Sequence, residues 1–166
     1  MKAEFPANEA SRIEALQSYN ILNTSPETSF DDLSLLATQI CQTPIALISF
    51  IDDKRQWFKS QIGLNLTEIA RDDAFCAHTL LNSDEFLEVP DARLDARFTD
   101  NPLVTGNSKI VFYASVPLLT QDNYVVGTLS VCDFAVKELN GAQKQALQAL
   151  ARQVLTMLEL RKSLSL

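Results

Sequence analysis

The chain has 166 residues, 46% of them hydrophobic and 21% charged, so it is long enough to bury a core of its own. Its net charge of −7 would repel a phosphate backbone, and no long basic cluster is present, which excludes nucleic acid as an expected partner. The longest apolar run, PIALISFI, is far shorter than the roughly 20 residues of a membrane span. The N-terminus has no apolar signal core, and three scattered cysteines do not suggest a disulfide framework. We therefore expect a single cytoplasmic domain, residues 1–166, with no membrane partner.

Two helices are expected in the N-terminal part, residues 8–42. Asn8 is a candidate N-cap for a first helix through EASRIEALQSY. Turn-forming residues in ILNTSPE follow, and Ser29 with Asp32 three residues later resembles a capping box for a second helix. The apolar residues of this second segment recur at helical spacing as far as Cys41.

The middle of the chain predicts strands on both sides of a helical segment. PIALISFID and RQWFKSQIG form an expected hairpin, DDAFCAHTLL a helix, and FLEVPD a short strand. Residues 92–109 are polar and irregular, and predict a short helix within a long loop. IVFYASVPLLT and VVGTLSVCD are two further strands, and a long helix runs from Asn140 to about Lys162. This order predicts an antiparallel sheet with helices on its faces, an α+β domain.

Cys76 and the only histidine, His78, lie two residues apart in DDAFCAHTLL. On a helix, such residues point roughly 200° apart, so they cannot both bind one metal ion, nor can the histidine act directly as base for the thiol. Free cysteine is among the most buried residue types, and Phe75, Cys76 and Leu80 are expected on a buried face. We expect no metal site here.

No other catalytic pattern is present. Gly63, Gly106, Gly127 and Gly141 are isolated, so there is no phosphate-binding glycine loop, and no serine lies in a nucleophile elbow. In the charged loop, residues 91–101, Arg93 is expected to face solvent. Arg97, beside Phe98, is the better candidate for an inward, anchoring role. We expect no catalytic residue.

Four segments, in order, resemble the GAF family: RDDAFCAHTLL, VPDARLDARFTDNPLV, FYASVPLL and VVGTLSVCD. They are most similar to the subgroup found at the N-terminus of bacterial sensor histidine kinases and diguanylate cyclases, and the likeness runs from about residue 8 to residue 160. The resemblance implies an antiparallel sheet of five or six strands, with the N- and C-terminal helices on one face. Loop helices would cover a ligand pocket on the other face.

The resemblance leaves the ligand open, because GAF proteins bind cyclic nucleotides, bilins, haem or small metabolites, and many act as dimerising relays. Bilin-binding relatives carry a cysteine beside a histidine before the strand that matches IVFYASVPLL; the segment LVTGNSK has neither, so a bilin is disfavoured and the cofactor is unknown. A branch that reduces free methionine sulfoxide uses cysteines in pocket loops. Here Cys41 is in an expected helix and Cys132 in an expected strand.

We therefore expect a non-catalytic sensory or regulatory domain that binds a small molecule or relays a signal to a histidine kinase or cyclase output domain. The alternatives are a free methionine sulfoxide reductase-like enzyme and a purely structural dimerisation module. The expected pocket lies between the sheet and the two middle segments, with an apolar wall and few polar groups. Its candidate lining residues are Phe75, Cys76, His78, Arg97, Phe98, Asn101, Phe112, Tyr113 and Ser115.

The terminal helix, residues 140–164, carries a broad apolar stripe that predicts a signalling and dimerisation helix. A coiled-coil seam would use its residues at intervals of three and four, and Ala151, Leu155 and Leu158 widen the stripe. We expect a parallel homodimer that is firm from Leu147 to Met157 and weakened further on by Arg161. The alternative is that the whole stripe packs on the chain's own first two helices. The seam positions are Leu147, Leu150, Val154, Met157, Arg161 and Leu164.

Overall fold

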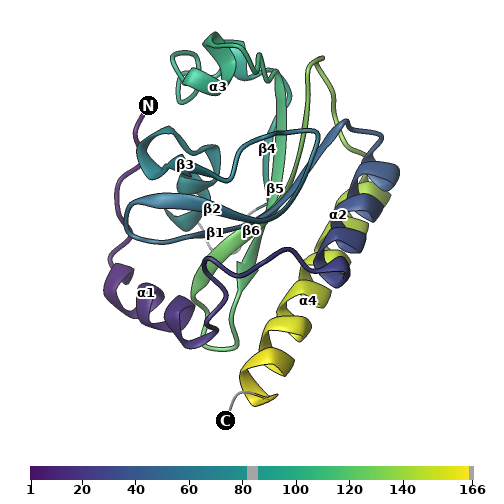
Figure 1. Ribbon diagram of the computed structural model, residues 1–166. Helices are drawn as coiled ribbons and strands as arrows, with labels where there is room; N and C mark the ends of the chain where they lie inside the picture. Colours follow the sequence, from purple (N-terminus) through teal and green to yellow (C-terminus); the bar gives the residue numbers. More distant parts are fainter. Residues whose placement is uncertain (82–85, 165–166) are drawn as a thin grey trace.

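A six-stranded antiparallel sheet forms the centre of the protein (Figure 1). The computed structural model describes residues 1–81 and 86–164. The strand order across the sheet is β3-β2-β1-β6-β5-β4, so the first and last long strands, β1 and β6, lie side by side. The expected antiparallel α+β fold is confirmed. The strands are β1 (Ile45–Ile51), β2 (Arg55–Ile62), β3 (Glu68–Ala70), β4 (Leu87–Val89), β5 (Phe112–Leu119) and β6 (Val125–Asp133).

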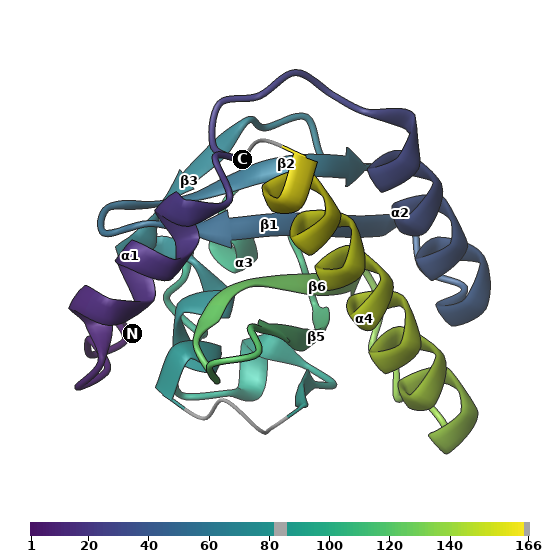
Figure 2. The same ribbon diagram turned by 90° about the horizontal axis from the view of Figure 1, so that it is seen from below.

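Different helices pack on the two faces of the sheet. The terminal helices α1 (Glu9–Ser18), α2 (Thr28–Cys41) and α4 (Gly141–Leu164) lie on one face, where α2 and α4 run side by side (Figure 2). Short helices lie on the other face and above the end of the sheet (Figure 1). This division into terminal and loop helices is the expected one. The short helices are η1 (Arg71–Asp73), η2 (Phe75–Leu81), η3 (Ala92–Leu94) and α3 (Pro102–Thr105).

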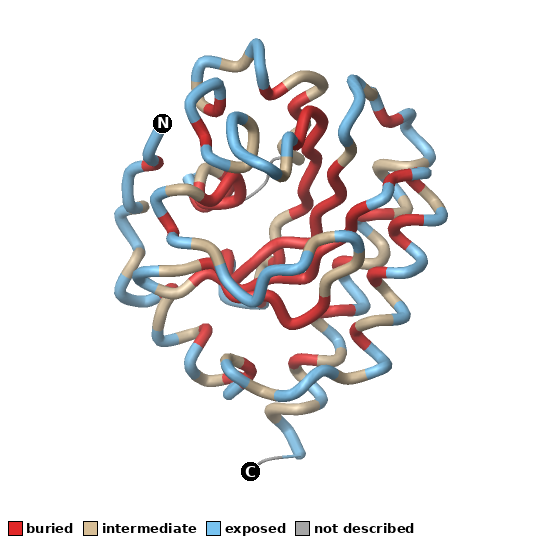
Figure 3. The backbone as a smooth tube through the Cα atoms, turned by 45° about the horizontal axis from the view of Figure 1, so that its top comes forward, coloured by how far each residue is buried: buried red, intermediate tan, exposed pale blue. Residues whose placement is uncertain are grey.

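Side-chain alternation along the strands divides the interior into two cores. On β1, Ile48 and Phe50 belong to the core under the terminal helices, whereas Leu47 and Ile51 belong to the core under the short helices. Because both faces are covered, β1 and most of β5 and β6 are buried along their length (Figure 3). This explains why these strands read as nearly continuous apolar runs in the sequence.

Helix starts differ from the expected ones. Neither Asn8 before α1 nor Glu27 before α2 caps its helix through a side chain, and Ser29 lies inside α2, so the expected capping box is wrong. A reciprocal capping box is found instead at α4. There Asn140 Oδ1 accepts from the Gln143 amide at 2.8 Å, and Gln143 Oε1 accepts from the Asn140 amide at 2.9 Å. The expected helix at residues 72–81 is replaced by the 3₁₀ segments η1 and η2.

A buried ionic cluster joins α1 to the ends of the central strands. Arg12 is only 1% exposed, and its Nη1 donates to the carbonyl of Ile51 at 2.6 Å and to that of Val125 at 3.3 Å. Glu9 accepts hydrogen bonds from both Arg12 and Arg71. Burial alone would raise the pKa of Glu9, but these two guanidinium groups hold it below its usual value. The resulting stabilisation is complete at neutral pH and is lost on acidification through the lowered folded-state pKa.

Removing the Arg12 side chain tests this cluster. We expect Arg12→Ala to lower the free energy of unfolding by about 3–5 kcal/mol, because one half of a buried charge pair is deleted and buried carbonyls lose their donor. Arg93→Ala is the control, since Arg93 pairs with Asp91 from an exposed position, and it should cost about 0–1 kcal/mol. Equal losses in urea unfolding would contradict the anchoring role.

Candidate functional site

A row of buried hydroxyl side chains crosses the sheet face that η2 covers. It consists of Ser49 on β1, Thr128 and Ser130 on β6, and Ser115 on β5, all of them fully buried. Ser49 is the cross-strand neighbour of Thr128, and Ser115 that of Ser130, so each pair shares one face of the sheet. We call these four residues the hydroxyl row.

The hydroxyl row is only partly satisfied by hydrogen bonds. Ser49 Oγ lies 3.2 Å from Thr128 Oγ1 and accepts from Gln56 Nε2 at 2.9 Å. Ser115 Oγ lies 3.3 Å from Thr79 Oγ1 of η2. Among the described residues, however, the buried Ser130 Oγ and Tyr113 hydroxyl form no hydrogen bond of normal geometry, although Ser115 and Ser130 lie beside Tyr113.

An aromatic cluster closes one side of the hydroxyl row. The Phe75 ring of η2 stacks on Phe98 with centroids 4.4 Å apart, and meets Tyr113 edge-on at 4.9 Å. His78 meets Phe98 edge-on at 5.0 Å. Such offset and edge-to-face pairs are the arrangements that aromatic quadrupoles favour. They hold η2 and the loop before α3 against β5.

The thiols on this face are protonated at neutral pH. Burial raises the pKa of Cys76 to about 12, and it also raises the pKa of Cys132. On the opposite face, burial raises the pKa of Cys41 to about 11. All three cysteines are free. Because the thiolate is the nucleophile and the metal ligand, none of these groups is activated for either role.

Polar residues at the rim are engaged with their neighbours. His78 Nε2 lies 2.9 Å from the Met1 carbonyl, and burial lowers the pKa of its ring. Arg97 binds Asp95 through Nε at 3.0 Å and Nη2 at 2.8 Å, and its side chain is 37% exposed. The inward, anchoring role expected for Arg97 is therefore wrong.

Asn101 connects two of the short helices. Its Nδ2 donates to the carbonyl of Asp73 in η1 at 2.8 Å, and its Oδ1 accepts from the amide of Leu103 in α3 at 2.9 Å. The side chain is buried by these contacts. Asn101 thus holds the cover of the site in place, and its own hydrogen-bonding groups are occupied.

All the expected pocket residues except Phe112 lie along η2, on the strand face beneath it, or in the loop that packs on it. Phe112 belongs to the core on the opposite face, under the terminal helices. Neighbouring strand residues point to opposite faces, so Phe112 and Tyr113 cannot line one pocket. The sequence analysis also missed five buried polar residues. For Ser49, Thr128 and Ser130 the available signal is a hydroxyl residue inside an apolar strand, as in LISFI and GTLSV. Gln56 of β2 and Thr79 of η2 carry no such signal.

The first five residues lie across the outside of η1 and η2. Ala3 is buried in the same core as Cys76, and the Phe5 ring lies 3.9 Å from the Arg71 guanidinium carbon. Lys2 pairs with Asp72 at 3.8 Å. We call residues 1–5 the N-terminal strap, because it adds a layer over the cover of the hydroxyl row.

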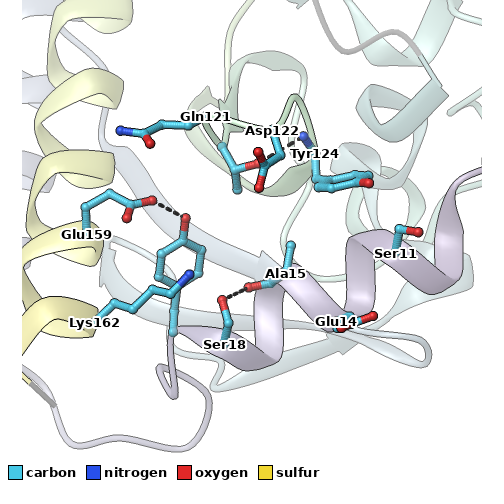
Figure 4. A pocket seen from close by; sticks show the side chains of 11 residues that line it. Ser11, Glu14, Ala15, Ser18, Gln121, Asp122, Tyr124, Glu159 and Lys162 are labelled. Atoms are coloured by element: carbon cyan, nitrogen blue, oxygen red, sulfur yellow. Dashed lines mark hydrogen bonds between the residues drawn. The ribbon is translucent and has the colours of Figure 1, made fainter. Parts of the chain in front are cut away.

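The described surface hollows lie elsewhere. Figure 4 shows a polar one of about 330 Å³ between α1, the β5–β6 turn and α4, where the Tyr19 hydroxyl donates to Glu159. An apolar one of about 560 Å³ lies between Phe30 of α2 and Met157, Leu160 and Leu164 of α4. None of the five hollows that we describe is lined by a residue of the hydroxyl row. The row is thus closed beneath η2.

Two features are absent from residues 1–81 and 86–164. No three histidine, cysteine, aspartate or glutamate side chains in these ranges gather closely enough to hold a metal ion. Within the same ranges, no helix combines the length and the apolar character that crossing a membrane requires.

Comparison with known proteins places this architecture in a family. The model of the GAF domain matches residues 25–158, and the chain therefore belongs to the GAF domain family. A cyclic di-GMP phosphodiesterase of Pseudomonas aeruginosa is 43% identical over 129 residues, which are 78% of this chain and 22% of that protein. The chain therefore spans about a fifth of the length of this relative.

Solved structures share the fold at low sequence identity. The GAF domain of an Acinetobacter phosphoenolpyruvate-protein phosphotransferase superposes with a TM-score of 0.67 and 16% identity, covering 95% of this chain and 96% of that one. A type II free methionine-R-sulfoxide reductase from Thermoplasma acidophilum gives a TM-score of 0.65 and 10% identity, covering 79% and 90%. At such identities the likeness establishes the fold alone.

Loosening the N-terminal strap should expose Cys76. We expect Ala3→Asp to speed the reaction of Cys76 with a thiol reagent by about tenfold or more, because a buried carboxylate weakens the strap and favours local opening. Peptide mass spectrometry resolves Cys76 from Cys41, which lies on the other face and should keep its rate. Glu4→Ala, an exposed strap position, is the matched control. Unchanged labelling of Cys76 in Ala3→Asp would contradict a covering role.

Proposed function

We propose that this GAF domain is a bacterial sensory or regulatory module that binds a small molecule beneath η2. The observation that carries the proposal is the hydroxyl row with the Tyr113 hydroxyl beside it, a closed set of buried hydrogen-bonding groups in which Tyr113 and Ser130 form no hydrogen bond of normal geometry. Small-ligand sites combine apolar walls with few convergent polar groups, and the aromatic cluster of Phe75 and Phe98 supplies such a wall.

The domain is proposed to be non-catalytic. Cys76 and Cys132 are buried and protonated, His78 is bonded to the strap, and Arg97 is paired with Asp95. A nucleophile needs a base within hydrogen-bond reach, and the side chains that hydrogen-bond Cys76 are the hydroxyls of Thr128 and Ser49. A free methionine sulfoxide reductase-like activity is the second candidate, favoured only by the shared fold of the Thermoplasma enzyme.

A route from the site to the terminal helix runs through β5. Tyr113 and Ser115 face the site, whereas Phe112, Ala114 and Val116 face the core that α4 covers. A ligand that shifts β5 would therefore shift the surface on which α4 rests. We propose that α4 passes this change to an output domain, such as a histidine kinase or a cyclic nucleotide enzyme, in the bacterial cytoplasm. The signalling name of the Pseudomonas relative supports this setting.

Native mass spectrometry of the chain purified from its own host tests the sensing function. We expect a bound small molecule in the wild type, because unpartnered buried hydroxyls are costly unless a ligand meets them. We also expect no turnover of free methionine sulfoxide with dithiothreitol above that of the Cys76→Ser control. Turnover that depends on Cys76 would favour the reductase, and a dimer that never carries a small molecule would favour the purely structural module.

The expected dimer seam on α4 is wrong in part. Leu147 and Val154 are fully buried against the chain's own sheet, so they cannot face a partner while the domain stays folded. Exposed apolar residues lie instead at the distal end, where Leu160 is 59% and Leu164 is 78% exposed. They border the apolar hollow beside Phe30. We propose a homodimer that forms through this distal end of α4.

Sedimentation equilibrium at micromolar concentration tests the distal interface. We expect Leu160→Glu to weaken self-association by about 2 kcal/mol or more, since it places a charge at the centre of the apolar surface. Gln121→Glu in the β5–β6 turn adds the same charge at another exposed position and should leave association unchanged. A wild-type protein that is strictly monomeric, or equal effects of both variants, would refute this interface.

A further inference from the structure

The distal end of α4 is held to the rest of the domain mainly by polar contacts. Leu158 is the last buried residue of α4 within the described part of the chain. Beyond it, Arg161 Nη1 lies 3.0 Å from Glu27 Oε2, and Glu159 accepts a hydrogen bond from the Tyr19 hydroxyl. Contacts between partly exposed charged groups are weak and are screened by salt. The last turns of α4 should therefore detach more easily than the buried part of the helix.

Glu27, the N-cap residue of α2, binds a second cation, which is buried. Its Oε2 lies 2.6 Å from Lys59 Nζ of β2, and the Lys59 side chain is fully buried. The same ammonium group donates to Thr24 Oγ1 at 2.7 Å and to the Ser25 carbonyl at 2.6 Å. The hydrogen bond from Lys59 is the largest of the effects that hold the pKa of Glu27 below its usual value, and Arg161 contributes less. We call Glu27, Lys59 and Arg161 the Glu27 cluster.

An irregularity in the sheet places Lys59 at this position. The register between β1 and β2 shifts at Lys59, which has no partner across the two strands. A bulge of this kind redirects side chains. Successive strand residues normally point to opposite faces, yet Lys59 and Ser60 both contact the start of α2. Lys59 binds Glu27. Ser60 Oγ donates to Asp31 Oδ1 at 2.7 Å. The Glu27 cluster is thus anchored on the sheet.

The two cations of the Glu27 cluster differ in what their loss does to the fold. When Arg161 leaves, Glu27 keeps Lys59, and the guanidinium, whose side chain is already 32% exposed, enters water. No buried charge is left uncompensated. When Glu27 is removed, in contrast, the buried ammonium of Lys59 loses the one carboxylate that it pairs with among the described residues. An uncompensated buried charge is strongly destabilising, so the release of Arg161 is the motion of lower cost.

We infer that the Glu27 cluster is a releasable latch for the distal end of α4. Lys59 keeps Glu27 on the sheet. Arg161 binds Glu27 when the end of the helix is docked and leaves it when the end is detached. Both residues of this outer pair line the apolar hollow beside Phe30, so detachment enlarges that hollow at the proposed dimer surface. The inference rests on the proposed role of α4 in transmission and names the contact that regulates it.

Thiol labelling at two positions of one core tests the latch. Leu158→Cys places a thiol under the distal end of α4, and native Cys41 lies in the same core at the far end of α2 from Glu27. In that background, Arg161→Gln should speed labelling of the introduced thiol about threefold to fivefold and leave Cys41 unchanged, because one partly exposed ion pair is lost. Sodium chloride at about 1 M should have a similar effect, and no further effect on Arg161→Gln.

Two further variants in the same background serve as controls. Glu27→Gln leaves Lys59 buried without a counter-charge, so it should lower Tm and speed labelling at both positions. Arg152→Gln removes an exposed cation of α4 that forms no ion pair among the described residues, and it should change neither rate. Equal acceleration of both thiols by Arg161→Gln, or no acceleration of either, would overturn the inference.

Amide hydrogen exchange gives the same comparison if Leu158→Cys does not fold. In the chain with its native Leu158, Arg161→Gln should speed exchange in residues 157–161 and leave residues 143–150 unchanged. Unchanged exchange in residues 157–161 would overturn the latch.

Sedimentation equilibrium of the wild type separates the latch from the proposed dimer. Labelling as expected in a chain that is strictly monomeric supports the latch and removes the interface. Labelling that Arg161→Gln does not alter, in a chain that dimerises, overturns the latch and leaves the interface.

Discussion

Strand alternation between two covered faces is the constraint on which the rest of the structure depends. Each inward residue of β1, β5 and β6 must pack either under the terminal helices or under η2. The helix side is mainly apolar, with groups such as Ile48 and Phe112, and its buried Ser34 donates to Ser60. The η2 side interrupts its apolar surface with the hydroxyl row. One sheet therefore separates a mainly apolar core from a core that carries a row of buried hydroxyls.

The buried charges lie at the ends of the central strands. The buried guanidinium of Arg12 is placed at the ends of β1 and β6, where backbone carbonyls and Glu9 compensate it. Arg71 donates to the same two carboxylate oxygens of Glu9 and to the carbonyl of Asp52. Because an uncompensated buried charge is strongly destabilising, α1 depends on these pairs for its place at the ends of the central strands.

The sequence predicted the order of elements because hydrophobic periodicity and ordered family motifs act over many residues. It also brought Phe75, Cys76, Tyr113 and Ser115 together, and in the structure these four residues lie on one side of the sheet. The face of the sheet on which each strand residue lies was harder to predict, because it depends on the register of the strand. Phe112 was therefore assigned to a pocket that it cannot reach. The hydroxyl row was missed for a related reason: its members come from three strands and meet only through cross-strand pairing.

Local signals were overridden where tertiary contacts dominate. The α2 capping box failed because α2 begins one residue before Ser29, with Glu27 at the cap position. The apolar stripe of α4 has the spacing of a coiled-coil seam. Leu147 and Val154, however, are buried by packing on the chain's own sheet. Apolar periodicity on a helix does not distinguish a partner from the helix's own domain. Only the burial of each residue makes that distinction. Leu160 and Leu164 are exposed and do not belong to the domain's own core.

A crystal structure of the protein purified from its own host, at a resolution that shows ordered water, tests the central claim most directly. The account predicts electron density for a small molecule below η2, within hydrogen-bond distance of the Tyr113 hydroxyl or Ser130 Oγ. A direct hydrogen bond between these two hydroxyls, or a single water molecule in place of a ligand, would contradict it.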